Sequence, residues 1–223
     1  MNNPYSLHGK KALVTGGKRR IGRGIALSLA EAGCDVGIND IVSDADADET
    51  MRLIRERSCE AEFFQADISN SVQVEAMFTD FHKRFGRIDI LVNNPYGGTG
   101  QPFLDISEEN WNANIDIGLK GFFLCSQQAA RAMVEQGDGG SIVSTSSVHG
   151  ARAWKGDTAY GTAKAGILRM TESMAVDLGQ YGIRCNAILP GHMDTTHEIG
   201  TPPPERGSIQ EGLGVSVPLL RRG

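Results

Sequence analysis

Three residues in the second half of the chain have types and a spacing that suit proton transfer. Tyr160 and Lys164 lie four residues apart in the segment AYGTAKAGILRM, whose pattern predicts a helix, so both side chains share one helix face. Ser147 ends the apolar segment GSIVSTSS, 13 residues before Tyr160. A free tyrosine has a pKa of about 10, and a nearby ammonium lowers it because it favours the phenolate. Tyr160 could then exchange a proton with a carbonyl or an alcohol, while the serine hydroxyl hydrogen-bonds the same oxygen.

A tyrosine and a lysine at this spacing occur by chance in many helices, but a glycine-rich loop near the N-terminus supplies context. The apolar run 12–15 leads into this loop, and a helix pattern follows it. Glycines at such a turn let the backbone approach a pyrophosphate, and the helix N-terminus offers free N–H groups. The spacing is not G-x-G-x-x-G, so the loop alone does not establish a dinucleotide site. Its residues are Gly16, Gly17, Lys18, Arg19, Arg20, Ile21 and Gly22.

The next predicted strand ends in Asp40, where a carboxylate that reads a ribose belongs. Such a carboxylate accepts hydrogen bonds from the adenosine ribose hydroxyls and repels the 2′-phosphate of NADP. The three basic residues 18–20 act in the opposite direction, because they could pair with that phosphate. We therefore expect NAD as the cofactor, with NADP as the alternative.

Short β-branched runs alternate with longer helical patterns along the chain. This alternation predicts an α/β fold, a Rossmann-like doubly wound parallel sheet in a three-layer αβα arrangement. No repeat or linker divides the chain, so we expect a single domain over 1–223. The predicted strands are 12–15, 35–39, 61–65, 88–92, 141–145 and 184–189. The predicted helices are 21–32, 45–57, 72–85, 108–135 and 158–180.

Composition restricts the partners. The chain has 223 residues and a net charge of −5, which gives no general attraction to nucleic acid or to an anionic membrane. No apolar run approaches the length of about 20 residues that spans a bilayer, and the N-terminus lacks the features of a signal peptide. The 4 cysteines are widely spaced, so we expect buried thiols, no metal site and a cytoplasmic protein.

Taken together, these motifs resemble the short-chain dehydrogenase/reductase family over nearly the whole chain. The matching features, in order, are TGGKRRIG, Asp40, Ala66-Asp67, Asn93-Asn94, Ser147, Tyr160 with Lys164, and Pro190-Gly191 with Thr195. The resemblance implies an oxidoreductase that moves hydride between NAD(P) and a secondary alcohol or ketone. It also implies a homo-oligomer, either a tetramer or a dimer.

The resemblance assigns further residues to the cofactor. Asp67 and Ile68 would hold the adenine, and Asn93 would contact the adenosine ribose and stabilise the central sheet. Lys164 would also bind the nicotinamide ribose. The residues expected to border the nicotinamide are Pro190, Gly191, Met193 and Thr195.

Three motifs depart from the family pattern. Arg20 replaces a glycine, as in pteridine reductases, which use NADP. Pro95 and Tyr96 replace the Ala-Gly of N-N-A-G, and the proline removes a backbone donor beside the cofactor. Gly118 stands where the family has an asparagine that supports a water chain from the lysine. We hypothesise that Asn114, one helical turn earlier, or a water at Gly118 partly fills this role.

The C-terminal part differs from the family as well. Members that resemble this chain continue past its end, so we expect a final strand to be missing. Residues 195–215 occupy the place of a mobile substrate lid. The substrate pocket is expected to include Tyr96, His149, Trp154 and His192. Nothing in the sequence names the substrate.

Three functions stay open at this point. The first is an NAD(P)-dependent dehydrogenase in which Tyr160 is the acid/base. The second is a dinucleotide-binding sensor or scaffold with little catalysis, which Gly118 favours. The third is a pteridine-type reductase, which Arg20 favours. The intact serine, tyrosine and lysine favour an enzyme, because a binding module needs no tuned tyrosine.

Overall fold

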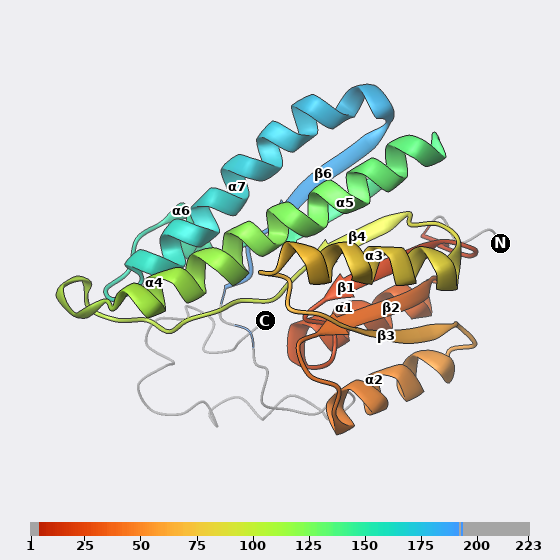
Figure 1. The fold of residues 1–223 in the computed structure, drawn as a ribbon, viewed down its shortest axis with the longest axis horizontal. Helices are drawn as coiled ribbons and strands as arrows, with labels where there is room; N and C mark the ends of the chain where they lie inside the picture. Colours follow the sequence, from red (N-terminus) through yellow and green to blue (C-terminus); the bar gives the residue numbers. More distant parts are fainter. Residues whose placement is uncertain (1–4, 192, 194–223) are drawn as a thin grey trace.

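The computed structural model describes residues 5–191 and 193. Its centre is a six-stranded sheet in the order β3-β2-β1-β4-β5-β6, and every neighbouring pair is parallel. The predicted Rossmann-like α/β class is therefore confirmed (Figure 1). Each predicted strand is present, with ends displaced by at most two residues. The strands are β1 Lys11–Thr15, β2 Asp35–Asp40, β3 Ala61–Gln65, β4 Ile90–Asn93, β5 Gly140–Thr145 and β6 Ile183–Ile188.

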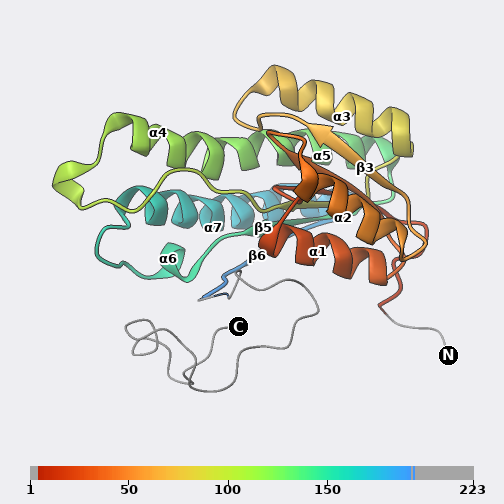
Figure 2. The same ribbon diagram turned by 90° about the horizontal axis from the view of Figure 1, so that it is seen from below.

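Helices cover both faces of the sheet, and each face has its own apolar core (Figure 2). Side chains of α1 and α2 pack on one face, and those of α3, α5 and α7 pack on the other. Successive residues of a strand point to opposite faces, so Leu13 joins one core while Ala12 and Val14 join the other. The helices are α1 Arg20–Glu31, α2 Ala45–Arg55, α3 Ser71–Phe85, α4 Glu108–Ile115, α5 Gly121–Gln136, α6 Val148–Ala151 and α7 Thr158–Leu178.

One helix prediction is wrong, because the predicted helix is interrupted in the structure. The sequence predicted a single helix over 108–135, but a π-helical turn at Asp116–Lys120 separates α4 from α5. Such turns widen the helix locally and occur frequently at functional sites. This turn contains Gly118, the position at which the family pattern has an asparagine.

The parallel sheet gathers the expected site residues at one edge. Strand β1 lies between β2 and β4, where the strand order reverses, and ligands bind beyond the carboxyl ends of strands at such a point. Thr15, Asp40, Asn93 and Thr145 each end one of these strands. The fold therefore brings together loops that are far apart in the sequence.

All four cysteines are buried free thiols, as expected. Within the described residues, no helix has the length and apolar character needed to cross a bilayer. The expected lid at 195–215, together with His192 and Thr195, lies outside the described residues.

Candidate active site

Ser147 and Tyr160 come from two elements that are bonded to each other. Ser147 precedes α6, and its Oγ accepts a hydrogen bond of 3.2 Å from the backbone N–H of His149. Ser146 donates from its Oγ to the backbone carbonyl of Lys164 at 2.8 Å. Gly150 lies so close to α7 that an added Cβ would meet the Lys164 backbone at 2.8 Å. The short helix α6 is therefore held against the helix that carries Tyr160 and Lys164.

The side chain of Lys164 is almost completely buried, with 2% of the residue exposed. Its Nζ donates a 2.8 Å hydrogen bond to the backbone carbonyl of Thr145, at the end of β5. The same nitrogen lies 5.2 Å from the ring centre of Phe122 and 5.7 Å from that of Tyr160. Burial lowers the pKa of Lys164 to about 8. Its ammonium can therefore release and recover a proton close to neutral pH.

The pKa of Tyr160 differs from the expectation. The sequence analysis expected the lysine to lower it, but burial raises it above its ordinary value in this structure. A hydrogen bond from Ser147 acts in the opposite direction, and nearby Tyr96 adds to the increase. The physical cause is burial, because the phenolate would lose hydration in this part of the protein. A tyrosine with its ordinary pKa of about 10 is already protonated at neutral pH, and the upward shift moves Tyr160 further from ionisation.

Three of the predicted pocket residues gather around Tyr160. The ring of Tyr96 meets that of Tyr160 edge-on, with centroids 6.5 Å apart. The His149 ring also meets it edge-on, at 5.6 Å, and Trp154 stacks on His149 at 4.3 Å. The sequence analysis missed Asp157, whose carboxylate lies 3.0 Å from His149 Nδ1. Its position directly before a predicted helix suggests a cap, but its side chain makes no capping bond.

The glycine loop is shaped by close backbone contacts. Gly16 has a φ of +62°, and an added Cβ there would lie 3.0 Å from the Cβ of Pro95. At Gly22 a Cβ would lie only 2.0 Å from the carbonyl oxygen of Gly16, so no larger residue fits. Arg20 also has a positive φ, of 52°, a conformation that glycine adopts more readily. The loop therefore folds tightly over the start of α1, which begins at Arg20.

The first turn of α1 has the free donors that an anion needs. Its N-cap residue, Arg19, makes no capping hydrogen bond with its side chain. By contrast, α2, α3 and α4 are capped by Asp44, Asn70 and Ser107. A helix N-terminus with uncapped N–H groups beside a glycine turn is suited to a phosphate. These residues fit the pyrophosphate of a dinucleotide.

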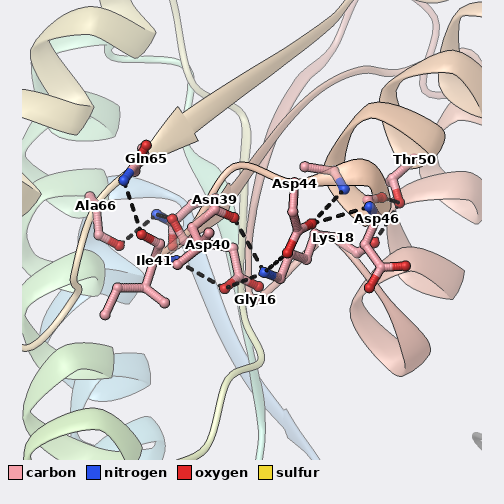
Figure 3. A network of polar contacts seen from close by, with 12 residues as sticks. Gly16, Lys18, Asn39, Asp40, Ile41, Asp44, Asp46, Thr50, Gln65 and Ala66 are labelled. Atoms are coloured by element: carbon pink, nitrogen blue, oxygen red, sulfur yellow. Dashed lines mark hydrogen bonds and ion pairs between the residues drawn. The ribbon is translucent and has the colours of Figure 1, made fainter.

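The ammonium of Lys18 points toward Asp40 and Asp44, at the turn between β2 and α2 (Figure 3). Its Nζ lies 2.8 Å from Asp44, 3.2 Å from the carbonyl of Val42 and 3.7 Å from Asp40. Only 6% of the residue is exposed, whereas Arg19 and Arg20 are exposed. The hydrogen bond with Asp44 raises the pKa of Lys18 and lowers that of the aspartate.

Arg23 completes this network from α1. Its guanidinium donates twice to the Lys18 carbonyl, at 3.1 and 3.0 Å, and also to Asp46 and Thr50. Thr50 donates to the same Lys18 carbonyl at 2.7 Å. The glycine loop is therefore tied to α2, and the charge of Lys18 is already paired with carboxylates.

The remaining cofactor residues predicted from the family resemblance lie at the same sheet edge. Asn93 is fully buried, and its amide donates to Ser126 Oγ at 2.9 Å, which joins the end of β4 to α5. Among the residues that the structure describes, none hydrogen-bonds its Oδ1. Asn94 instead reaches the loop, donating to the Gly16 carbonyl at 3.2 Å. Asp67 accepts bonds from Ser69.

Ile68, Pro190 and Met193 have separate environments. Ile68 is buried, and an added Cβ at Gly121 would lie 2.7 Å from its side chain. Pro190 accepts a 3.2 Å hydrogen bond from the N–H of Val148, which joins the turn after β6 to the catalytic serine loop. Met193 is exposed. The cofactor contacts assigned to these residues, and to Asp67, Asn93 and Gly191, stay predictions.

Asn114 does not bond to Lys164 in this structure. Its amide donates to the backbone and the side-chain oxygen of Asn110, at 2.9 and 2.8 Å. Gly118 is buried, and an added Cβ would meet the Cβ of Ala163 at 3.5 Å, an ordinary contact distance. The site thus has room at Gly118, and the idea that water occupies it stays a prediction.

The buried ammonium should make stability depend on pH in a specific way. A lysine whose pKa falls from 10.5 to about 8 on folding destabilises the native state below pH 8. This destabilisation disappears as the pH rises toward 10.5, the pKa of the lysine in the unfolded chain. Between pH 7 and pH 9.5, the wild type should therefore gain about 2 kcal/mol in free energy of unfolding relative to Lys164→Met. Chemical denaturation at both pH values measures this difference.

The control for this prediction is Lys83→Met, which removes an exposed ammonium paired with Asp80. Its stability difference from the wild type should be nearly independent of pH over this range. An equally flat difference for Lys164→Met would contradict a lowered pKa for Lys164.

Comparisons with known proteins agree with this geometry. The family model for short chain dehydrogenase matches residues 10–204. A 3-oxoacyl-[acyl-carrier-protein] reductase, FabG, of Staphylococcus aureus is 35% identical over 216 residues, 96% of this chain and 85% of that protein. The structure of acetoin dehydrogenase YohF from Salmonella typhimurium has a TM-score of 0.86 and 33% identity, covering 96% of this chain and 83% of its own. Carveol dehydrogenase from Mycobacterium avium, solved in complex with NAD, has a TM-score of 0.81 and 31% identity, covering 85% and 73%. The chain therefore belongs to the short-chain dehydrogenase family of oxidoreductases.

Proposed function

We propose that this protein transfers hydride between NAD and a secondary alcohol or ketone, with Tyr160 as the acid/base. The observation that carries the proposal is the convergence of Ser147, Tyr160 and the buried Lys164 at one edge of the sheet. The uncapped start of α1 and Asp40 lie at the ends of strands on the same edge. A bound dinucleotide and the proton donor Tyr160 would therefore both reach the same substrate.

Tyr160 and Ser147 have different roles in the proposed reaction. When bound, the nicotinamide supplies or accepts the hydride at the substrate carbon. Tyr160, which is protonated at neutral pH, donates its proton to the carbonyl oxygen during reduction. For oxidation it must first lose this proton, and the phenolate then takes one from the alcohol. Ser147 Oγ accepts from the His149 N–H, and its hydroxyl, which hydrogen-bonds Tyr160 in this structure, would turn to the substrate oxygen when a substrate is bound.

Lys164 is suited to restore the proton of Tyr160. Its pKa of about 8 means that the ammonium loses a proton more readily than an ordinary lysine. The nitrogen lies 5.7 Å from the centre of the Tyr160 ring, close enough for proton exchange through a bound hydroxyl or water. Reduction of a ketone would consume one proton from this pair in each turnover.

The arrangement around Asp40 supports NAD over NADP. A carboxylate about 4 Å from a 2′-phosphate is repelled by up to about 4 kcal/mol per unit charge at an effective dielectric of about 20. Lys18, one of the basic residues that could offset this, is paired with Asp44 and nearly buried. The NAD bound to carveol dehydrogenase is in line with this choice. Arg19 and Arg20, which are exposed, keep NADP as the alternative.

A second candidate is a dinucleotide-binding sensor with little turnover. One observation favours it: Gly118 leaves space where the family has an asparagine. The sensor would bind NADH and yet reduce no ketone, so the two candidates differ in turnover and not in binding.

The Tyr160→Phe variant tests the proposed chemistry. Removing the phenolic proton should lower turnover of a responsive ketone by about 10²–10⁴-fold and leave NADH binding unchanged, because general acid catalysis contributes about that factor. The assay is NADH oxidation with a panel of ketones. Tyr181→Phe, which changes a half-exposed tyrosine beyond the other end of α7, is the matched control. Full activity of Tyr160→Phe would refute the proposal, and NADH binding without turnover in the wild type would favour the sensor.

Cofactor choice gives a second test. We expect NADH to bind at least about tenfold more tightly than NADPH, a difference of about 1.4 kcal/mol. Asp40→Asn should reduce this preference, because it removes the repelling charge, whereas Asp48→Asn on the exposed side of α2 should not. Titration followed by nicotinamide fluorescence measures the affinities of the three proteins for both cofactors. Tighter binding of NADPH by the wild type would show that Arg19 and Arg20 outweigh Asp40.

A further inference from the structure

His149 is held in a fixed orientation beside Tyr160. Its Nδ1 lies 3.0 Å from Asp157 Oδ2, and its ring stacks on Trp154 with an interplanar angle of 26°. The side chain of Asp157 is only 12% exposed, whereas that of His149 is 34% exposed. Asp157 therefore holds the His149 ring through Nδ1, and Trp154 covers one face of the ring. The side chain is still accessible to a ligand.

The contacts of Asp157 determine which nitrogen of His149 carries hydrogen. Asp157 Oδ2 also accepts a 3.0 Å hydrogen bond from the backbone N–H of Trp154, so this oxygen acts as an acceptor toward both neighbours. His149 Nδ1 must then be the donor, and Nε2 of the neutral ring is left as an acceptor. No described residue hydrogen-bonds Nε2. The neutral ring, whose centre lies 5.6 Å from that of Tyr160, thus offers one unused acceptor.

Asp157 is itself fixed relative to Tyr160. Its carbonyl accepts a 2.6 Å hydrogen bond from the N–H of Gly161, the residue after Tyr160. An added Cβ at Gly161 would lie 3.2 Å from both Asp157 Oδ2 and the His149 carbonyl. Glycine therefore lets the carboxylate and the histidine pack against the first turn of α7.

From this geometry we infer that His149 Nε2 accepts a hydrogen bond from a second substrate oxygen, a hydroxyl on the carbon next to the reacting one. The inference rests on the proposed function, in which Tyr160 binds the reacting oxygen. The edge contact between the two rings, with centroids 5.6 Å apart, suits two neighbouring oxygens of one small molecule. The preferred substrates are accordingly α-hydroxy ketones and the vicinal diols formed from them.

A purely structural role for the cluster would give the same contacts but different kinetics. Asp157 could serve only to pin the loop that carries Trp154, because it bonds the Trp154 N–H. In that case, changing His149 would disturb all substrates alike. A binding role instead predicts that only substrates with the second hydroxyl respond.

Hydroxyacetone and acetone form the matched substrate pair, since they differ by one hydroxyl next to the carbonyl. For reduction with NADH, His149→Leu should lower kcat/KM for hydroxyacetone about tenfold, the factor that one hydrogen bond contributes, mainly through KM. The value for acetone should change by less than about twofold. His149→Gln, whose amide oxygen can accept a hydrogen bond, should restore part of the loss. Asp157→Asn tests the positioning role, and we expect it too to affect hydroxyacetone selectively.

NADH affinity of each variant serves as the check that the protein is folded. Equal losses for the two ketones in His149→Leu and His149→Gln, with NADH binding intact, would overturn the inference while the proposed function stood. The same holds if these variants keep the wild-type ratio between the two ketones. If the wild type binds NADH but reduces no ketone of any kind, the proposed function fails and the inference fails with it.

Discussion

The site depends on an ammonium group that is kept away from water at the carboxyl end of β5. Burying a charge is costly unless polar groups replace the lost hydration. Here the Thr145 carbonyl accepts a hydrogen bond from Lys164, and the rings of Phe122 and Tyr160 present their π-electrons nearby. The cost that is not recovered is visible in the lowered pKa of the lysine. The same burial that makes Lys164 a ready proton source moves Tyr160 further from ionisation.

Several irregular features of the fold surround this group. The π turn Asp116–Lys120 interrupts a long helix just before Phe122, the residue whose ring lies nearest to the ammonium. Gly150 lets α6 approach the backbone of Lys164, and Ser146 bonds that backbone. Each departure from regular structure thus shapes the space around one side chain. The dinucleotide end is organised differently, by charge pairs that tie the glycine loop to α2.

Much of the fold and of the candidate site was predictable from the sequence. Strands buried on both faces form continuous apolar runs, which explains why all six were found. The partnership of Tyr160 with Lys164 follows from helical spacing, and the place of Asp40 follows from the order of strand and loop.

The errors concern features that depend on contacts between distant residues. Residues 116–120 have ordinary helical periodicity, so the sequence hides the π turn. The direction of the Tyr160 pKa depends on burial, and the pairing of Lys18 with Asp44 spans 26 residues. Asp157 was missed because an acidic residue before a helix usually caps it, whereas here it bonds His149.

The most direct test of the account is the pKa of Lys164 itself. Proteins labelled with ¹³C and ¹⁵N in lysine allow its side chain to be titrated by NMR, with Lys164→Met used to assign the resonance. The account predicts a midpoint of about 8, separated from the other lysines. A midpoint near the ordinary lysine value of about 10.4 would mean that the ammonium is hydrated, and the central claim about this site would be wrong.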